Sequence, residues 1–129
     1  MTHSIPALRP VETMTFDHDR LARVCDEYGH RAEAYIAFVL TEIETLVLTA
    51  AHQRAEPSGL QRSCGDLAKL CDTIGMLTLG NAARAVIDCL DRADTAAQAA
   101  CLARLVRLGQ ADGLGKWTLD RGAMPDTVA

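Results

Sequence analysis

The sequence predicts an all-α protein: an antiparallel up-down four-helix bundle with a short additional N-terminal helix. Of its 129 residues, 49% are hydrophobic and 4% aromatic, so the core is expected to consist mainly of Leu, Ala, Val and Ile. Alanine and leucine are strong helix formers. Apolar residues recur at intervals of three and four, the period of an amphipathic helix, and no segment alternates as a β-strand does. The short loops between the last four helices favour antiparallel neighbours.

The first helix is expected to start near Asp17 and to end at Gly29, a residue that commonly follows the last turn of a helix. Its apolar face repeats at i, i+3, i+4 and i+7. The residues of this face are Leu21, Val24, Cys25 and Tyr28.

A long helix is expected from about His30 to Ala55, followed by a break at residues 56–59, Glu-Pro-Ser-Gly. Ser58 could cap the next helix, which is expected to start near Leu60 and to end near Gly75. The inner stripe of that third helix consists of Leu60, Cys64, Leu67, Cys71 and Ile74.

The fourth helix is expected to have Thr78 or Asn81 as its cap and to extend to Leu90. A turn at 92–94 follows, and Asp94 or Thr95 can cap the fifth helix, which Gly109 ends. The residues expected to face inward from the fifth helix are Ala99, Leu102, Leu105 and Val106.

These elements predict three parts of the chain. Residues 1–14 form an arm without periodicity, residues 15–109 form the helical bundle, and residues 110–129 form a flexible, Gly- and Asp-rich tail. Trp117, the only tryptophan, lies in this tail and either docks on the bundle or is exposed.

The charge and the apolar pattern exclude several classes of function. The net charge of −4 argues against a nucleic-acid binder, which needs a basic face to displace counterions from phosphates. Glu42 and Glu44 interrupt the longest apolar region, so we expect no membrane span. The N-terminal residues lack the apolar core of a signal peptide, and a cytoplasmic, reduced location is expected.

The chain has five cysteines, an odd number without a CxxC pair. We expect them to be small buried hydrophobic residues rather than ligands. Cys64 and Cys71 share a helix face, but a metal site there would need further ligands, so no metal and no cofactor are expected.

The segment CGDLAKLCDTIGMLTLGNAARAVIDCL, from Cys64 to Leu90, resembles the middle of a histidine-phosphotransfer (HPt) domain. The motif helix of that family reads His-x-Leu-Lys-Gly, followed by small residues and Leu-Gly, with the histidine ten positions before the final glycine. Ile74 and Gly75 match the closing pair, and Leu67 matches the leucine of the motif. Residues 80–94 resemble the next helix of the family. The resemblance covers residues 16–109 and implies the HPt-like bundle.

This register puts Gly65 at the position of the histidine, Ala68 at the lysine and Lys69 at the small residue. A phosphotransfer histidine must be exposed and partly neutral near pH 7 to attack a phosphoryl group through a ring nitrogen. Glycine has no side chain and cannot do so. The resemblance therefore implies a member without a catalytic residue, and not an enzyme.

The resemblance further implies a partner, either the receiver domain of a response regulator or a histidine kinase, docked on the exposed face of the second and third helices. Arg62 and Lys69 would pair with the acidic pocket of a receiver, and Gly65 would allow close approach of its backbone. The residues expected on or near this surface are Gln61, Arg62, Gly65, Asp66, Lys69 and Asp72.

Other interpretations stay open. The same helices could form a structural or self-associating module. Another histidine could accept phosphate, and His52 is better placed for this than His3, His18 or His30. Cysteine or metal chemistry lacks an acid–base pair or a ligand cluster, and the acidic balance argues against a helix-turn-helix at 67–87.

Overall fold

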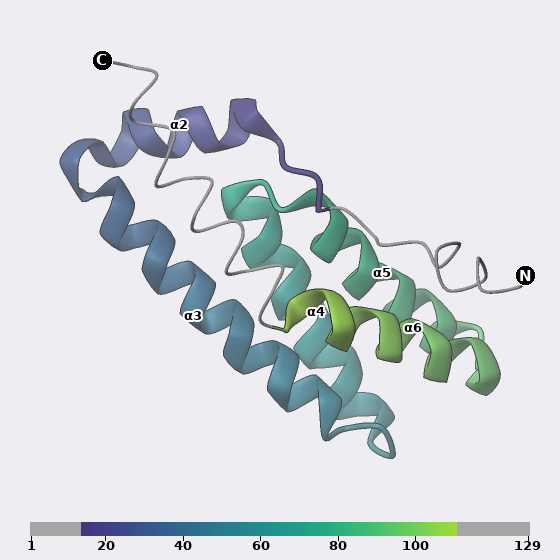
Figure 1. The fold of residues 1–129 in the computed structure, drawn as a ribbon. Helices are drawn as coiled ribbons and strands as arrows, with labels where there is room; N and C mark the ends of the chain where they lie inside the picture. The colour runs from purple at the N-terminus through teal and green to yellow at the C-terminus, as the bar shows by residue number, and fades with distance from the viewer. Residues whose placement is uncertain (1–13, 111–129) are drawn as a thin grey trace, which may run out of the picture.

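The computed structural model describes residues 14–110. This part of the chain is all-α, as predicted, with an isolated bridge between Phe16 and Met76 and no strand. The helices in Figure 1 are α2 (His18–Tyr28), the 3-10 helix η1 (Gly29–Arg31), α3 (Ala32–Ala51), α4 (Pro57–Ile74), α5 (Leu77–Asp91) and α6 (Thr95–Gly109). The predicted arm, except Met14, and the predicted tail beyond Gln110, with Trp117, lie outside the described residues.

Helix α2 starts where the sequence predicts. The carboxylate of Asp17, the N-cap, accepts a hydrogen bond of 3.1 Å from the backbone N–H of Arg20. Gly29 follows the last turn with φ of +56°, a conformation that glycine adopts at little cost. The prediction that Cys25 faces inward is wrong, because its side chain is exposed. Helix α2 contacts α3 and α4 and lies across one end of the longer helices (Figure 1).

Backbone hydrogen bonds hold the chain before α2 against the turn between α4 and α5. The N–H of Asp17 donates to the carbonyl of Gly75 at 2.7 Å, and the N–H of Leu77 donates to the carbonyl of Thr15 at 3.0 Å. The hydroxyl of Thr78 accepts from the N–H of Thr15 at 2.7 Å. Thr78 is therefore not the cap of α5, which starts earlier than predicted, at Leu77.

Helix α3 is shorter than the predicted segment 30–55. The first residues of the predicted segment belong to η1 instead. At the other end α3 stops at Ala51, after which the N–H of His52 donates to the carbonyl of Thr49 at 3.1 Å. The residue before a proline avoids the helical region, and Glu56 has φ of −127° and ψ of 79°. The non-helical conformation of Glu56 therefore separates the end of α3 from the start of α4 at Pro57.

Helix α4 begins at Pro57, earlier than the predicted start near Leu60, and Ser58 is not its cap. Proline suits the first turn because its missing N–H would have no partner there, and its φ is already helical. Gly75 ends the helix in the left-handed conformation, with φ of +78°. The predicted inner stripe of α4 is confirmed, since Leu60, Cys64, Leu67, Cys71 and Ile74 are all buried.

Helix α6 has Asp94 as its N-cap, as predicted, and the Asp94 carboxylate accepts from the N–H of Ala97 at 3.1 Å. Leu102 and Leu105 are buried and Val106 is half-buried, whereas Ala99 is exposed, contrary to the prediction. The first turns of α6 therefore contribute less to the core than its second half.

Helices α3, α4, α5 and α6 each contact the next, and α6 also contacts α3. Figure 1 shows these four helices running alternately in opposite directions. Gly109 lets α6 approach α3 closely, because a Cβ at this position would lie 2.6 Å from Cγ2 of Val47. The largest fully buried side chains between the helices are Ile36, Ile43, Leu60, Leu67, Ile74, Met76, Leu79 and Leu105.

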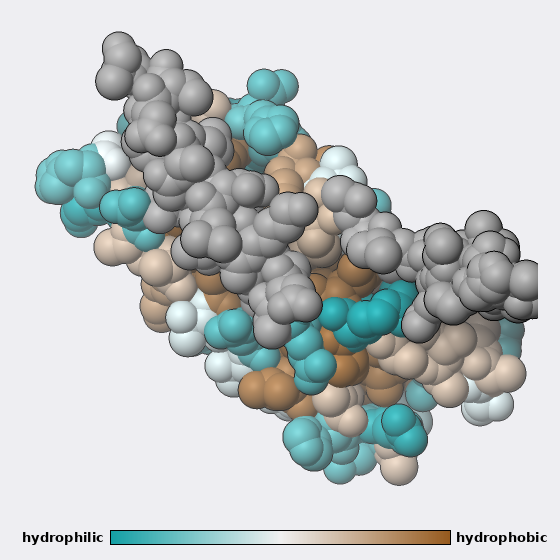
Figure 2. All heavy atoms as spheres, in the orientation of Figure 1, coloured by the Kyte–Doolittle hydropathy of each residue, from teal (hydrophilic) through white to brown (hydrophobic). Residues whose placement is uncertain are grey.

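On the part of the face in Figure 2 that is not grey, hydrophilic residues are scattered among hydrophobic ones. Among the described residues, the segment His18–Ala51 alone is long and apolar enough to cross a membrane, a test that a core helix of a soluble protein also passes. Within it, Ile36, Val39, Ile43 and Val47 pack in the core, and 28% of its most apolar 18-residue window is buried.

Candidate functional site

The candidate site is the exposed face of α4. The apolar residues of this helix point into the core, so its polar residues collect on the opposite side. All six residues that the sequence predicts for a docking surface lie on this face. Five of them are exposed, namely Gln61, Arg62, Asp66, Lys69 and Asp72, and Gly65 is half-buried.

Gly65 leaves an open position in the middle of this face. A Cβ built at Gly65 would have nothing within 4 Å outside its own helix. Gly80, on α5, differs, because a Cβ there would lie 3.3 Å from the Cβ of Cys71. Interhelical packing therefore does not require glycine at position 65, and another surface can approach the backbone closely there.

Two polar links join one flank of this face to α5. The amide of Gln61 donates to the carboxylate of Asp91 at 3.1 Å, and the guanidinium of Arg84 lies 3.2 Å from the carboxylate of Asp72. Gly65 lies between Gln61 and Asp72 along α4. The predicted surface lies on the second and third helices, and these two contacts show that the α4 part of it also adjoins α5, the fourth helix of the predicted order.

The cations of the face are available to a partner. Within the described part of the chain, neither the guanidinium of Arg62 nor the ammonium of Lys69 makes an ion pair or a hydrogen bond. The positive charge of Arg84, in contrast, is partly compensated by Asp72. Arg62 and Lys69 are therefore the groups on α4 best placed to meet an acidic surface.

No described histidine lies on α4. His18, His30 and His52 are exposed at the start of α2, in η1 and after α3. Nδ1 of His52 lies 2.8 Å from the carbonyl of Leu48. A carbonyl only accepts, so Nδ1 is the donor in this contact, and in a neutral ring Nε2 would carry the free lone pair. His3 lies outside the described residues.

The cysteines of α4 offer no nucleophile on this face. Cys64 and Cys71 are fully buried, as predicted. Burial raises the pKa of Cys64 to about 11, and burial with the charge of Asp72 raises the pKa of Cys71 to about 12. Both stay protonated at neutral pH, and a thiol is a poorer nucleophile and metal ligand than a thiolate.

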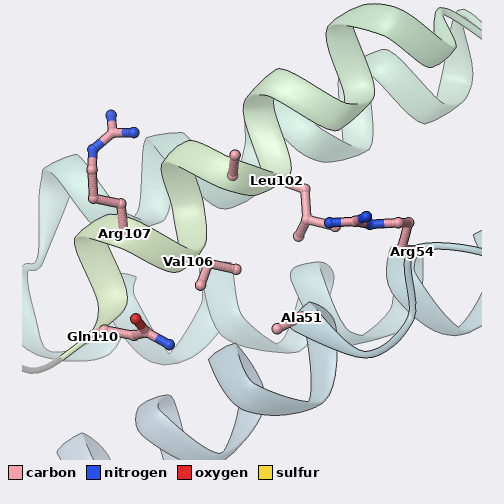
Figure 3. Close-up of a pocket in the computed structure, with 7 residues that line it drawn as sticks. Ala51, Arg54, Leu102, Val106, Arg107 and Gln110 are labelled. Carbon is pink, nitrogen blue, oxygen red and sulfur yellow. The ribbon is translucent and has the colours of Figure 1, made fainter.

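No group of three or more His, Cys, Asp or Glu side chains among the described residues could hold a metal ion. A hollow of about 590 Å³ lies between the end of α3 and α6, lined by Ala51, Arg54, Leu102, Ala103, Val106, Arg107 and Gln110. Figure 3 shows the guanidinium of Arg107 pointing away from Arg54, so the two do not form a clamp for an anion. The α4 face remains the better-defined candidate.

Sequence reasoning missed the contribution of α5. Asp72 is near the α4–α5 turn and pairs with Arg84, whereas Gln61 is far from the turn and pairs with Asp91. Residues near the turn thus pair with residues near the turn, and distant residues with distant ones, as in two antiparallel helices joined by a tight turn. Charged and amide residues at exposed positions on both helices were the available signal.

Comparison of the chain with protein-family models, with curated proteins and with solved structures finds no match.

Proposed function

We propose that this protein is a non-catalytic HPt-like signalling module that docks on a receiver domain of a response regulator, or on a histidine kinase, through the α4 face. It modulates a phosphorelay without carrying phosphate. On this proposal α3 to α6 are the antiparallel four-helix bundle of an HPt-like fold, α2 is its capping helix, and the protein acts in the cytoplasm.

The observation that supports the proposal most directly is the open position at Gly65, beside the unpaired cations Arg62 and Lys69. The resemblance puts the phospho-accepting histidine at residue 65. A docked partner that approaches this point would meet bare helix backbone instead of an imidazole. On this proposal the protein can therefore dock on its partner without accepting a phosphoryl group.

The charges suit a receiver domain as the partner. The phosphorylation pocket of a receiver is acidic, and exposed cations opposite an acidic pocket increase the association rate and fix orientation. Arg62 and Lys69 can supply this attraction. The carboxylate of Asp72 repels an acidic partner less strongly because Arg84 lies beside it.

The neighbours of Gly65 do not replace the missing histidine. The Cys64 thiol is buried, and its raised pKa keeps it protonated. A phosphoryl group on the exposed carboxylate of Asp66 would form an unstable mixed anhydride, and the charge of Asp66 repels an incoming phosphate. The module is therefore suited to sequester a regulator or to compete with a true phosphotransfer protein.

Binding to a panel of purified receiver domains and histidine kinases tests the proposal. We expect at least one to bind at low ionic strength. The substitutions Arg62→Ala and Lys69→Ala should each weaken binding about two- to fivefold, the effect of an exposed charge at the edge of an interface. Arg23→Ala, which removes an exposed cation from α2, is the matched control and should leave the affinity unchanged.

Incubation with a phosphorylated receiver tests the non-catalytic part. We expect no acid-labile, alkali-stable label on the protein. Such a label would contradict the proposal that the protein carries no phosphate. Loss of the label in the variant His52→Gln would then identify His52 as the acceptor. Equal binding by wild type, Arg62→Ala and Lys69→Ala would contradict the proposed surface.

A second candidate function, self-association, is favoured by the outer face of α3. Phe38 is 60% exposed and Leu48 is 53% exposed. With Ala34, Thr41 and Thr45 these exposed residues follow the 4-3-4-3 spacing of a coiled-coil seam. The hydroxyls of Thr41 and Thr45 donate to carbonyls of their own helix at 3.0 and 3.1 Å, so this stripe is less polar than its sequence suggests.

Sedimentation velocity distinguishes the candidates. A dimer that Phe38→Glu dissociates would support self-association through α3. A monomer at all concentrations would leave docking through α4 as the remaining function of the two.

A further inference from the structure

Two thiols meet between α5 and α6. Sγ of Cys89 lies 3.7 Å from Sγ of Cys101, on opposite sides of the turn at residues 92–94. Cys89 is only 3% exposed, whereas Cys101 is half-buried. One sulfur is therefore within reach of solutes, and the other lies directly behind it.

The other three cysteines are placed differently. Cys64 and Cys71 are completely buried in the core, where an oxidant cannot reach them. Cys25 is exposed on α2, and no thiol of the described residues lies within hydrogen-bonding distance of it. The pair between α5 and α6 is therefore distinct from both groups.

We propose that Cys89 and Cys101 form a redox-active thiol pair that a hydroperoxide converts into an intramolecular disulfide. This site is independent of docking through the α4 face and holds whether or not the protein binds a receiver.

The reaction with hydrogen peroxide has two steps. The thiolate of Cys101, which solutes reach first, attacks one peroxide oxygen. An S–O bond forms, the O–O bond breaks, and the released hydroxide leaves as water after taking a proton. The sulfur of Cys89 then attacks the sulfenic sulfur of Cys101. The S–S bond forms, the S–O bond breaks, and hydroxide leaves as water with the proton of Cys89. Two thiols and one peroxide give one disulfide and two waters, and two electrons pass to the peroxide.

The geometry suits the second step. A disulfide bond is about 2.05 Å long, so the two sulfur atoms, now 3.7 Å apart, must approach by about 1.7 Å. A guanidinium nitrogen of Arg92 lies 3.7 Å from Sγ of Cys89, and the carboxylate of Asp88 holds this arginine at 2.7 Å. Burial and the hydrogen bond to Cys101 raise the pKa of Cys89, and the Arg92 charge offsets only part of this rise, so Cys89 attacks from its thiol and loses its proton in the same step.

The sequence permits a direct chemical test. Trypsin cleaves after Arg84, Arg92 and Arg104, so Cys89 and Cys101 fall in separate peptides, 85–92 and 93–104. Reduced protein is treated with hydrogen peroxide in native buffer, alkylated, digested and analysed by mass spectrometry. We expect the intact protein to lose two hydrogens, and these two peptides to be joined as the main disulfide-linked species.

A parallel reaction in concentrated urea separates folded geometry from proximity in the chain. Unfolding should abolish the preference, because Cys64 and Cys71 are closer in sequence than Cys89 and Cys101. Cys89→Ala and Cys101→Ala should each prevent the native link, and Cys25→Ala, the matched control, should leave it intact. Circular dichroism of each variant checks that it is folded.

Two outcomes would overturn the proposal. One is oxidation of native Cys101 to the sulfinic acid without any link to Cys89. The other is native protein in which Cys25-linked dimers form while peptides 85–92 and 93–104 stay unlinked.

Discussion

The guanidinium of Arg84 on α5 lies 3.2 Å from the carboxylate of Asp72 on α4, at the edge of the face that contains Gly65. The hydrogen bond from Gln61 to Asp91 crosses the same edge further along the helices. Together they define where this face ends and fix the orientation of two of its polar side chains. The open position at Gly65 is thus bordered by side chains whose places are set by α5.

The Arg84–Asp72 pair is expected to stabilise the fold only slightly. Their side chains are 44% and 53% exposed, so solvent screens the attraction. A double-mutant cycle of Arg84→Ala and Asp72→Ala, followed by urea unfolding, should give a coupling of about 0.2–1 kcal/mol. A coupling well above this range would mean that the link is structurally essential.

Gly65→Ala should stabilise the protein. An alanine in the interior of a helix is favoured over glycine by about 0.5–1 kcal/mol, and the added Cβ would have open space. Gly109→Ala is the contrasting variant, because its Cβ would lie 2.6 Å from Val47 and force α6 away from α3, at a cost of about 1–3 kcal/mol. Urea unfolding measures both. Destabilisation by Gly65→Ala would contradict the open position.

Gly75→Ala should destabilise the protein by at least about 1–2 kcal/mol. The residue has φ of +78°, which an L-amino acid with a side chain adopts only at a cost of this size. Its Cβ would also lie 2.7 Å from the carbonyl oxygen of Asp17, where α2 is held against the α4–α5 turn. Thermal unfolding checks the loss, and unchanged stability would contradict the αL cap.

The free energy of unfolding should fall as the pH rises above about 9. The thiols of Cys64 and Cys71 have pKa values of about 11 and about 12 in the fold against an ordinary 9.0. Above pH 9 the unfolded chain releases these protons while the folded chain keeps them, so their contribution is complete below pH 9 and is lost toward the folded pKa values.

Urea unfolding from pH 8 to pH 10.5 measures this slope. Cys71→Ala should make the decline shallower, although it also lowers stability at every pH by leaving a cavity. Cys25→Ala, which removes an exposed thiol from outside the core, is the matched control. Identical slopes in all three proteins would show that buried thiols do not cause the decline.

Most of the helical architecture was predictable from the sequence. The period of apolar residues predicted every α-helix of the described range but not the 3-10 helix η1, and Asp17, Gly29, Gly75 and Asp94 were recognised as end residues. Such signals are local, so a single sequence reveals them. The helix starts at Pro57 and Leu77 were missed because Ser58 and Thr78 resemble caps. Which capping residue is used depends on tertiary contacts such as that of Thr78 with Thr15.

The candidate site was predictable only on one helix. Periodicity identified which residues of α4 are exposed, including Arg62 and Lys69. Periodicity did not predict how α4 and α5 are aligned with each other, nor the contact between Cys89 and Cys101 across the α5–α6 turn. Both depend on how neighbouring helices are rotated and shifted, which the spacing within one helix does not specify.

The most direct test of the central claim is a backbone-amide NMR titration of the protein with a receiver domain that it binds. We expect the largest chemical-shift changes along residues 61–72. Gly65→Trp, which fills the open position, should abolish binding. Ala99→Trp, at an exposed position of α6, is the control and should bind normally. Shift changes centred on Phe38 and Leu48 of α3, with unimpaired binding by Gly65→Trp, would contradict the account.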